Sequence, residues 1–169
     1  MALFCWGTYV PVSKLAFFKN NSVVGYQLFH YCMKQLIQPL VDASNNGMVM
    51  VCADGCIWHV FPILTAFIRD HPKQYLVACC TENSYLKCLV HADQRGTNAQ
   101  FPLCNQTQTK PTLHAQATGQ YPPKFIAKGL CPVFLPFWAD LSYTDIFLCI
   151  SSDILHQLHQ GLLKDHLKK

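Results

Sequence analysis

The stretch that most constrains the fold covers residues 48–80. It begins with a short apolar run, is interrupted by Asp54-Gly55, and returns to apolar character over residues 75–80. Between the two runs, apolar residues of the segment 61–69 recur at the three- and four-residue spacing of a helix. The pattern predicts a strand that ends at a carboxylate, then a helix, then a second strand.

Asp54 has two interpretations that are compatible with each other. A strand buried on both faces reads as a continuous apolar run, and in open α/β sheets ligands bind outside the carboxyl ends of parallel strands. Asp54 would then be an active-site acid, with a parallel strand beside its own. Asp-Gly is also the strongest short signal for a hairpin turn, because Asp tolerates positive φ and Gly supplies it. Asp54 would then simply turn the chain.

Length and composition describe one domain with a large apolar core. The chain has 169 residues, of which 51% are hydrophobic and 13% are charged. This charged fraction is about half the usual value of about 25%, so we expect part of the surface to contact a partner. The net charge is +4, but the basic residues are scattered except near the C-terminus, which is not the clustered pattern of a phosphate-tracking surface.

The cysteines and the N-terminus indicate an intracellular protein. The 10 cysteines are irregularly spaced, so we expect free thiols instead of a disulfide framework. The first residues lack the basic region and the cleavage site of a secretion signal. No apolar run approaches the roughly 20 residues of a membrane-spanning helix. The sequence predicts a nuclear or cytoplasmic protein that is neither secreted nor inserted in a membrane.

Further elements are predicted on both sides of the central stretch. Residues 2–12 are rich in aromatic and β-branched types and predict a strand. Residues 22–40 predict an amphipathic helix, which Gly47 can close with a left-handed cap. Residues 81–120 are polar and aperiodic, which predicts a long irregular insertion. A C-terminal helix with an apolar stripe is predicted to follow Ser152.

A few side chains are candidates for metal binding. His156 and His159 lie one helical turn apart and could grip a metal ion, or could simply be part of a polar helix face. Cys88 is a soft ligand, but the position three residues earlier, where a zinc knuckle would have a second Cys, is Tyr85. His30 is interpreted as a partly buried His with one hydrogen bond. Glycine-rich phosphate loops, GxSxG, HExxH and CxxC motifs are absent from the sequence.

Several blocks in order resemble one family. GTYVPVSKL is similar to a GYxPVxKL stretch, YQLFHYCMKQLIQPL to an LFHxCMxxILxPL helix, and residues 50–83 to a CADGxxRxxxPILAA…EN block. PFWADLSYTDIF and SSDILHQLHQGLLKDHL resemble PFWxDLPxxDIF and PDxLHQLHxGxxKDHL. The chain thus resembles, over nearly its whole length, the Plavaka transposases of fungal DNA transposons, which are grouped with CACTA-like cut-and-paste elements.

The resemblance implies an α/β fold with an RNase H-like core, a mixed sheet flanked by helices. In such a core, acidic residues hold Mg²⁺ or Mn²⁺ ions that cut and join DNA at transposon ends. Asp54 matches the second of these acids. Cys88, together with His156 or His159, would be a zinc site that ties the insertion to the core. The implied division is a partial core at 1–80, an irregular insertion with a knuckle remnant at 81–131, and a C-terminal helical segment at 132–169.

Departures from the family pattern predict a truncated and inactive transposase. The family's first catalytic Asp lies upstream of the GYxPV stretch, and the family parts that supply a third acid lie beyond KDHL. The zinc knuckle of the family has lost one of its Cys residues here. One carboxylate holds two ions poorly. An alternative is a non-catalytic module that binds DNA or pairs with a transposase, or with itself, through an exposed sheet edge. A third interpretation is a metal hydrolase built on His156, His159 and Asp165.

Overall fold

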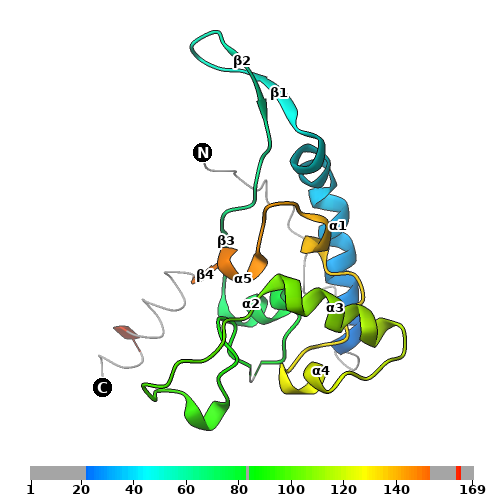
Figure 1. Ribbon diagram of the computed structural model, residues 1–169, viewed down its shortest axis with the longest axis vertical. Coiled ribbons are helices and arrows are strands. Elements are labelled where there is room, and N and C mark those ends of the chain that lie inside the picture. Colours follow the sequence, from blue (N-terminus) through cyan, green and yellow to red (C-terminus); the bar gives the residue numbers. More distant parts are fainter. Residues whose placement is uncertain (1–21, 83, 153–162, 165–169) are drawn as a thin grey trace.

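A helix of 25 residues, α1 (Ser22–Asn46), forms one side of the molecule in the computed structural model (Figure 1). The structure describes residues 22–82, 84–152 and 163–164. The helix predicted from residue 22 is confirmed, and Gly47 follows it with a φ of 72°, as expected of a left-handed cap. The predicted strand at 2–12 and most of the predicted C-terminal helix lie outside the described residues.

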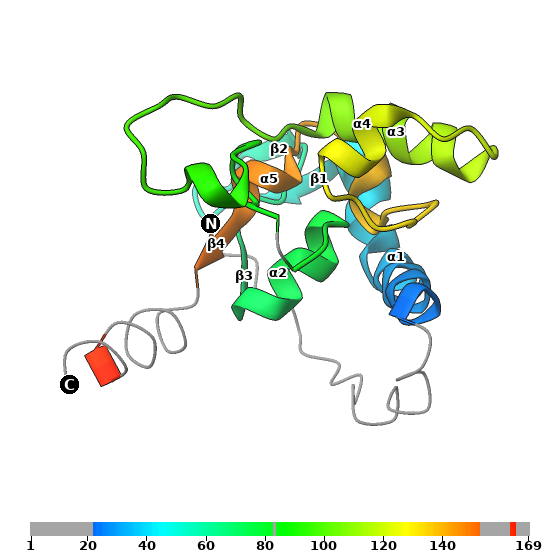
Figure 2. The same ribbon diagram turned by 90° about the horizontal axis from the view of Figure 1, so that it is seen from below.

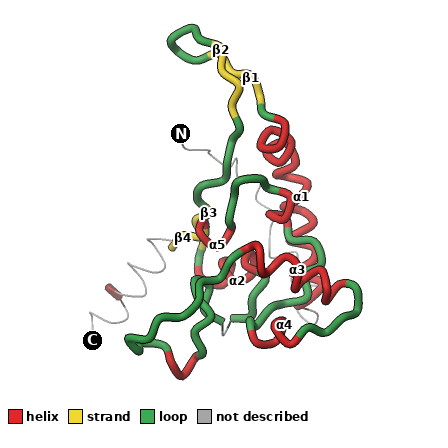
Figure 3. The backbone as a smooth tube through the Cα atoms, viewed as in Figure 1, coloured by secondary structure: helices red, strands yellow, loops and turns green. Residues whose placement is uncertain are grey.

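The elements after α1 are short. They are β1 (Met48–Val51), β2 (Ile57–Val60), β3 (Phe67–Arg69), α2 (His71–Ala78), η2 (Ala92–Gln94), α3 (Gln106–Ala117), α4 (Pro123–Ala127), η3 (Phe137–Asp140), α5 (Ile146–Cys149) and β4 (Ile150–Ser152). Figure 3 shows how much of the chain between them consists of loops. The predicted α/β class is confirmed at this coarse level.

The strands of the described residues form two separate two-stranded sheets. Strands β1 and β2 form an antiparallel hairpin with Met48 opposite Val60. Strand β3 pairs in parallel with β4, which brings Phe67 beside Ile150 from the other end of the chain. The parallel neighbour expected beside the strand of Asp54 is therefore wrong, because that strand turns back on itself.

Three predicted elements differ from the structure. The helix predicted at 61–69 is wrong: the chain there is extended and ends in β3. The strand predicted at 75–80 is also wrong, since most of it belongs to α2. The segment 81–120, predicted to be irregular, contains η2 and the 12-residue helix α3.

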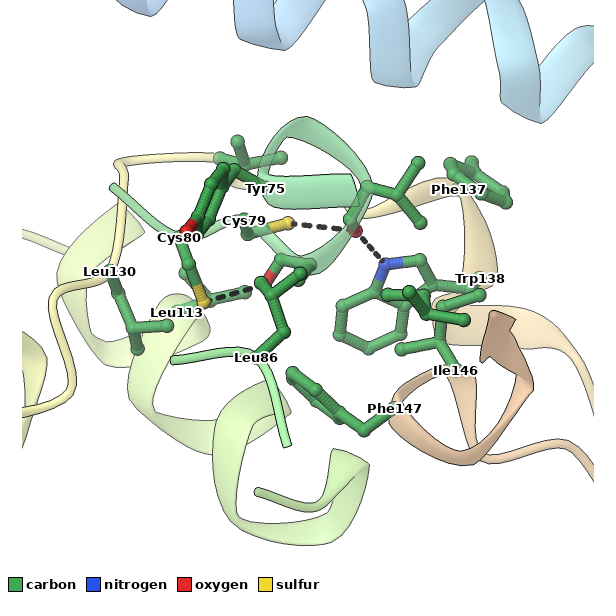
Figure 4. Close-up of a cluster of buried hydrophobic side chains, with 14 of the residues drawn as sticks. Tyr75, Cys79, Cys80, Leu86, Leu113, Leu130, Phe137, Trp138, Ile146 and Phe147 are labelled. Carbon is green, nitrogen blue, oxygen red and sulfur yellow. Dashed lines mark hydrogen bonds between the residues drawn. The ribbon is translucent and has the colours of Figure 1, made fainter. Parts of the chain in front are cut away.

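The core lies between α1, α2, α3 and the segment 133–150 (Figures 2 and 4). Trp138 is its largest fully buried side chain, and its indole Nε1 donates a 2.7 Å hydrogen bond to the Val77 carbonyl at the end of α2. Leu86, Leu113 and Leu130, from the segment predicted as an insertion, are buried in the same cluster. The segment 81–131 thus contributes to the core that α1 and α2 share.

Among the helices that the structure describes, none is both long enough and apolar enough to cross a membrane.

Candidate functional site

Asp54 lies in the turn of the β1–β2 hairpin. The Gly55 amide donates to the Cys52 carbonyl at 2.9 Å, and Gly55 has a φ of 80°, an arrangement typical of three-residue hairpin loops. Asp54 Oδ1 accepts a 2.9 Å hydrogen bond from the Cys56 amide, and the residue is exposed. The turn interpretation of Asp54 is confirmed: its carboxylate stabilises the loop that joins the two strands.

The hairpin extends away from the rest of the molecule, beyond the C-terminal end of α1 (Figure 1). Val49, Val51 and Ile57 on one face are 69%, 72% and 73% exposed, and Trp58 on the other face is 56% exposed. A two-stranded hairpin is marginally stable alone, and large exposed apolar patches mark interaction sites. The region around Asp54 therefore has the composition of a contact surface.

The described residues do not fit a two-ion centre. Two Mg²⁺ or Mn²⁺ ions about 4 Å apart share several carboxylate ligands. Over residues 22–82, 84–152 and 163–164, no three His, Cys, Asp or Glu side chains come together in a way that could hold a metal ion. Within this described part Asp54 belongs to no such group, so no catalytic step through bound ions can be derived from these residues.

The zinc ligands are placed only in part. Cys88 is half-buried and forms an isolated antiparallel bridge with Leu103, flanked by a 3.0 Å hydrogen bond from the Cys104 amide to the Lys87 carbonyl. This pairing closes the loop that contains η2. His156, His159 and Asp165 lie outside the described residues, so the structure does not bring them to Cys88 or separate them from it.

The described cysteines are free thiols, as the sequence predicts. Cys79 Sγ lies 3.4 Å from His30 Nε2, a distance at which a His could activate a thiol. Burial, however, lowers the pKa of His30 to about 4, although the hydrogen bond to the Leu76 carbonyl acts in the opposite direction. Burial also raises the pKa of the Cys79 thiol. Both side chains are thus neutral at pH 7 and enclosed, which makes this pair part of the packing.

A groove lies between α3 and the turn 141–145. It is lined by Gln106, Thr107, Lys110, Pro111, Leu141, Tyr143, Thr144 and Asp145. The sequence did not reveal this groove, because its two walls are more than 20 residues apart along the chain. The only local signal is an aromatic residue inside the polar turn Ser142-Tyr143-Thr144-Asp145.

Comparison with known proteins identifies the chain at the family level. A family model described as Plavaka transposase matches residues 2–169. No curated protein and no solved structure matches the chain. The family match includes α1, the hairpin with Asp54, the core around Trp138 and the groove beside α3. The chain belongs to the Plavaka transposase family.

Proposed function

We propose that the chain acts in DNA transposition as part of a DDE-type cut-and-paste transposase, and that it binds DNA without cleaving it on its own. The observation that carries this proposal is the family match over residues 2–169. The RNase H-like part of the proposal rests on the family resemblance, which aligns Asp54 with the second acid, and on the order in which α1 leads into β1 and Asp54. The strand pairing speaks against it, because among the described strands β1 pairs only with β2, in an antiparallel hairpin.

The position of Asp54 supports the proposed absence of cleavage. Phosphodiester cleavage by two ions needs carboxylates that converge on both ions. Asp54 is exposed in a turn, and the described part of the chain gathers no group of three metal-ligating side chains around it or elsewhere. Asp54 would serve as a divalent-ion ligand only where further carboxylates complete the centre.

A zinc role for Cys88 is part of the same proposal. Its thiol would combine with His156 or His159 to fix the segment 81–131 against the C-terminal part of the chain. The ordinary chemistry of Cys and His ligands supports this pairing, and binding of the metal would stabilise the folded chain. Zinc content of the purified chain, compared with the Cys88→Ser variant, tests it.

The test of the main proposal measures binding and cleavage separately. Fluorescence anisotropy of the full chain with a labelled duplex should show binding that weakens steeply with salt, because phosphate contacts release counterions. The same duplex, incubated with Mg²⁺ or Mn²⁺, should remain uncut. Asp54→Asn keeps an Asn-Gly turn and should bind the duplex as tightly as the parent. Absence of duplex binding, or cutting that Asp54→Asn abolishes, would contradict the proposal.

A second function is favoured by the exposed hairpin. Each of its strands has one edge without a partner strand in the described structure, and except for His59 its strand side chains are apolar on both faces. Such an edge can pair with a strand of another protein. The chain would then be a non-catalytic module that pairs with a transposase or with itself.

A further inference from the structure

Tyr143 is held in a backbone conformation that a tyrosine rarely adopts. Its φ is 59°, in the left-handed region, and its side chain is 78% exposed. Such a conformation costs about 1–3 kcal/mol in a residue other than Gly, and it persists only where the surroundings impose it. Because the ring is mostly exposed, packing of Tyr143 itself does not explain the strain.

The neighbours of Tyr143 impose this conformation from both sides. The Ser142 hydroxyl donates to Asn45 Oδ1 at the end of α1, and Thr144 Oγ1 accepts a 3.3 Å hydrogen bond from the Leu64 amide. The Asp145 carboxylate accepts from the Phe147 amide at 3.0 Å and from the Gln106 amide at 3.3 Å. The turn is thus fixed to α1, to the extended segment at Leu64 and to α3, and it presents the aromatic ring at the surface.

The groove beside this ring has mixed polar and apolar walls that carry one charge of each sign. Lys110 donates its Nζ to the Ala139 carbonyl, and burial lowers its pKa while Asp140 and Asp145 raise it. Asp140 in turn forms a 2.7 Å ion pair with Lys34. Lys110 and Asp145 thus give the groove one charge of each sign, and the Lys34–Asp140 pair is not part of its lining. Such a groove suits a planar, uncharged group with hydrogen-bonding edges better than it suits a phosphate.

We propose that this groove binds an unpaired DNA base, which stacks on Tyr143 and turns its edge toward Thr107 and Lys110. The inference rests on the proposed function, since it assumes that the chain meets DNA. Aromatic rings bind unpaired bases by stacking, at about 1–3 kcal/mol per base, with little dependence on base identity. A rigid turn stabilises such a complex further, because little backbone freedom of the turn is lost on binding.

The test compares three labelled DNAs by fluorescence anisotropy with the full chain. They are a blunt duplex, the same duplex with a three-nucleotide overhang, and the same overhang without bases. The base-containing overhang should bind roughly 5-fold to 100-fold more tightly than the abasic one, as stacking of one base implies. Tyr143→Ala should remove this difference, and Tyr143→Phe should retain it. Binding of the blunt duplex should be unchanged in both variants.

Two further variants serve as controls. Tyr121→Ala removes a tyrosine that is 82% exposed and does not line the groove, and it should keep the preference for the base-containing overhang. Tyr143→Asn introduces a residue that tolerates the left-handed region, so it should raise the Tm and yet lose the preference. A higher Tm together with a lost preference would show that the preference is not lost through unfolding.

The outcomes distinguish this inference from the proposed function. Equal binding of the two overhangs by the parent chain would overturn the stacking site and leave duplex binding intact. A preference that survives in Tyr143→Ala would overturn the role of Tyr143 in the same way. Absence of binding to all three DNAs would overturn both proposals.

Discussion

His30 and Phe137 contact each other through their stacked rings and through a hydrogen bond. Their rings stack with centroids 5.4 Å apart and an interplanar angle of 28°, and the Phe137 amide donates a 3.2 Å hydrogen bond to His30 Nδ1. His30 Nε2 lies 2.9 Å from the Leu76 carbonyl, so this nitrogen carries the proton. The sequence predicted a partly buried His with one hydrogen bond, whereas His30 is fully buried and bonds two backbone groups, so that it connects α1, α2 and η3.

This arrangement predicts an acid-sensitive fold. The pKa of His30 is lowered by burial from 6.5 to about 4. As the pH falls below 6.5, His30 takes up a proton in the unfolded chain but not in the folded chain. The contribution of His30 to the free energy of unfolding is therefore fully present above pH 6.5 and decreases as the pH falls to about 4. The loss should reach about 3 kcal/mol, at about 1.4 kcal/mol per pKa unit. Urea unfolding at several pH values measures it.

The control for this prediction is an exposed histidine. His114→Gln should leave the pH dependence unchanged, because this side chain lies at the surface of α3. His30→Gln should be less stable at pH 7 but should lose most of the slope between pH 6.5 and 4. An unchanged slope in His30→Gln would mean that other groups cause the acid sensitivity.

Trp138→Phe should destabilise the chain because it removes the indole that donates a hydrogen bond to the buried Val77 carbonyl. The indole donates to the Val77 carbonyl at 2.7 Å, and the Cys79 thiol, a weak donor, lies 3.8 Å from the same oxygen. Loss of the indole donor should cost about 1–3 kcal/mol, with a further cost for the smaller ring. Trp58→Phe changes an indole that is 56% exposed and should have little effect. The denaturation midpoints of the two variants give the comparison.

Gly47→Ala and Gly25→Ala should change stability in opposite directions. A Cβ on Gly47 would collide with the His59 ring, and the φ of 72° disfavours any residue with a Cβ. We expect a loss of about 1–2 kcal/mol. Gly25 lies within α1 with open space around it, so Ala there should add about 0.5–1 kcal/mol.

His59→Ala in the Gly47→Ala background separates the two effects at Gly47. It removes the collision and leaves only the backbone strain, so stability should be partly restored. Thermal unfolding of the single and double variants measures the difference. A Gly47→Ala chain as stable as the parent would show that the hairpin does not keep this orientation in solution.

The exposed hairpin predicts self-association. Val51 and Ile57 lie opposite each other and are 72% and 73% exposed. Val51→Lys with Ile57→Glu places opposite charges across the hairpin, which keeps the pairing but removes apolar surface. The average mass from sedimentation should fall toward that of the monomer. Leu135→Lys with Leu148→Glu, at positions that are 66% and 74% exposed, should leave the mass unchanged.

The sequence predicted local elements best where a long periodic pattern and its end signals agreed. α1 has 25 residues, an apolar stripe and a Gly directly after its last residue. α2 was predicted as a strand because a short apolar run does not distinguish a buried strand from a buried helix. A start signal was present: Asp70 precedes the helix and Pro72 occupies its first turn, where Pro is favoured.

The sequence by itself determined the family and the helix α1, and it offered the hairpin turn as one of two interpretations of Asp54, because these depend on residue order and on conformational preferences within a few neighbours. Tertiary structure decided which surfaces meet. It alone paired β3 with β4, buried His30 against Phe137, placed Asp54 at the tip of a hairpin, and joined α3 to the strained turn of Tyr143. The physical reason is that contacts between distant segments depend on how the whole core packs around Trp138, which no local pattern encodes.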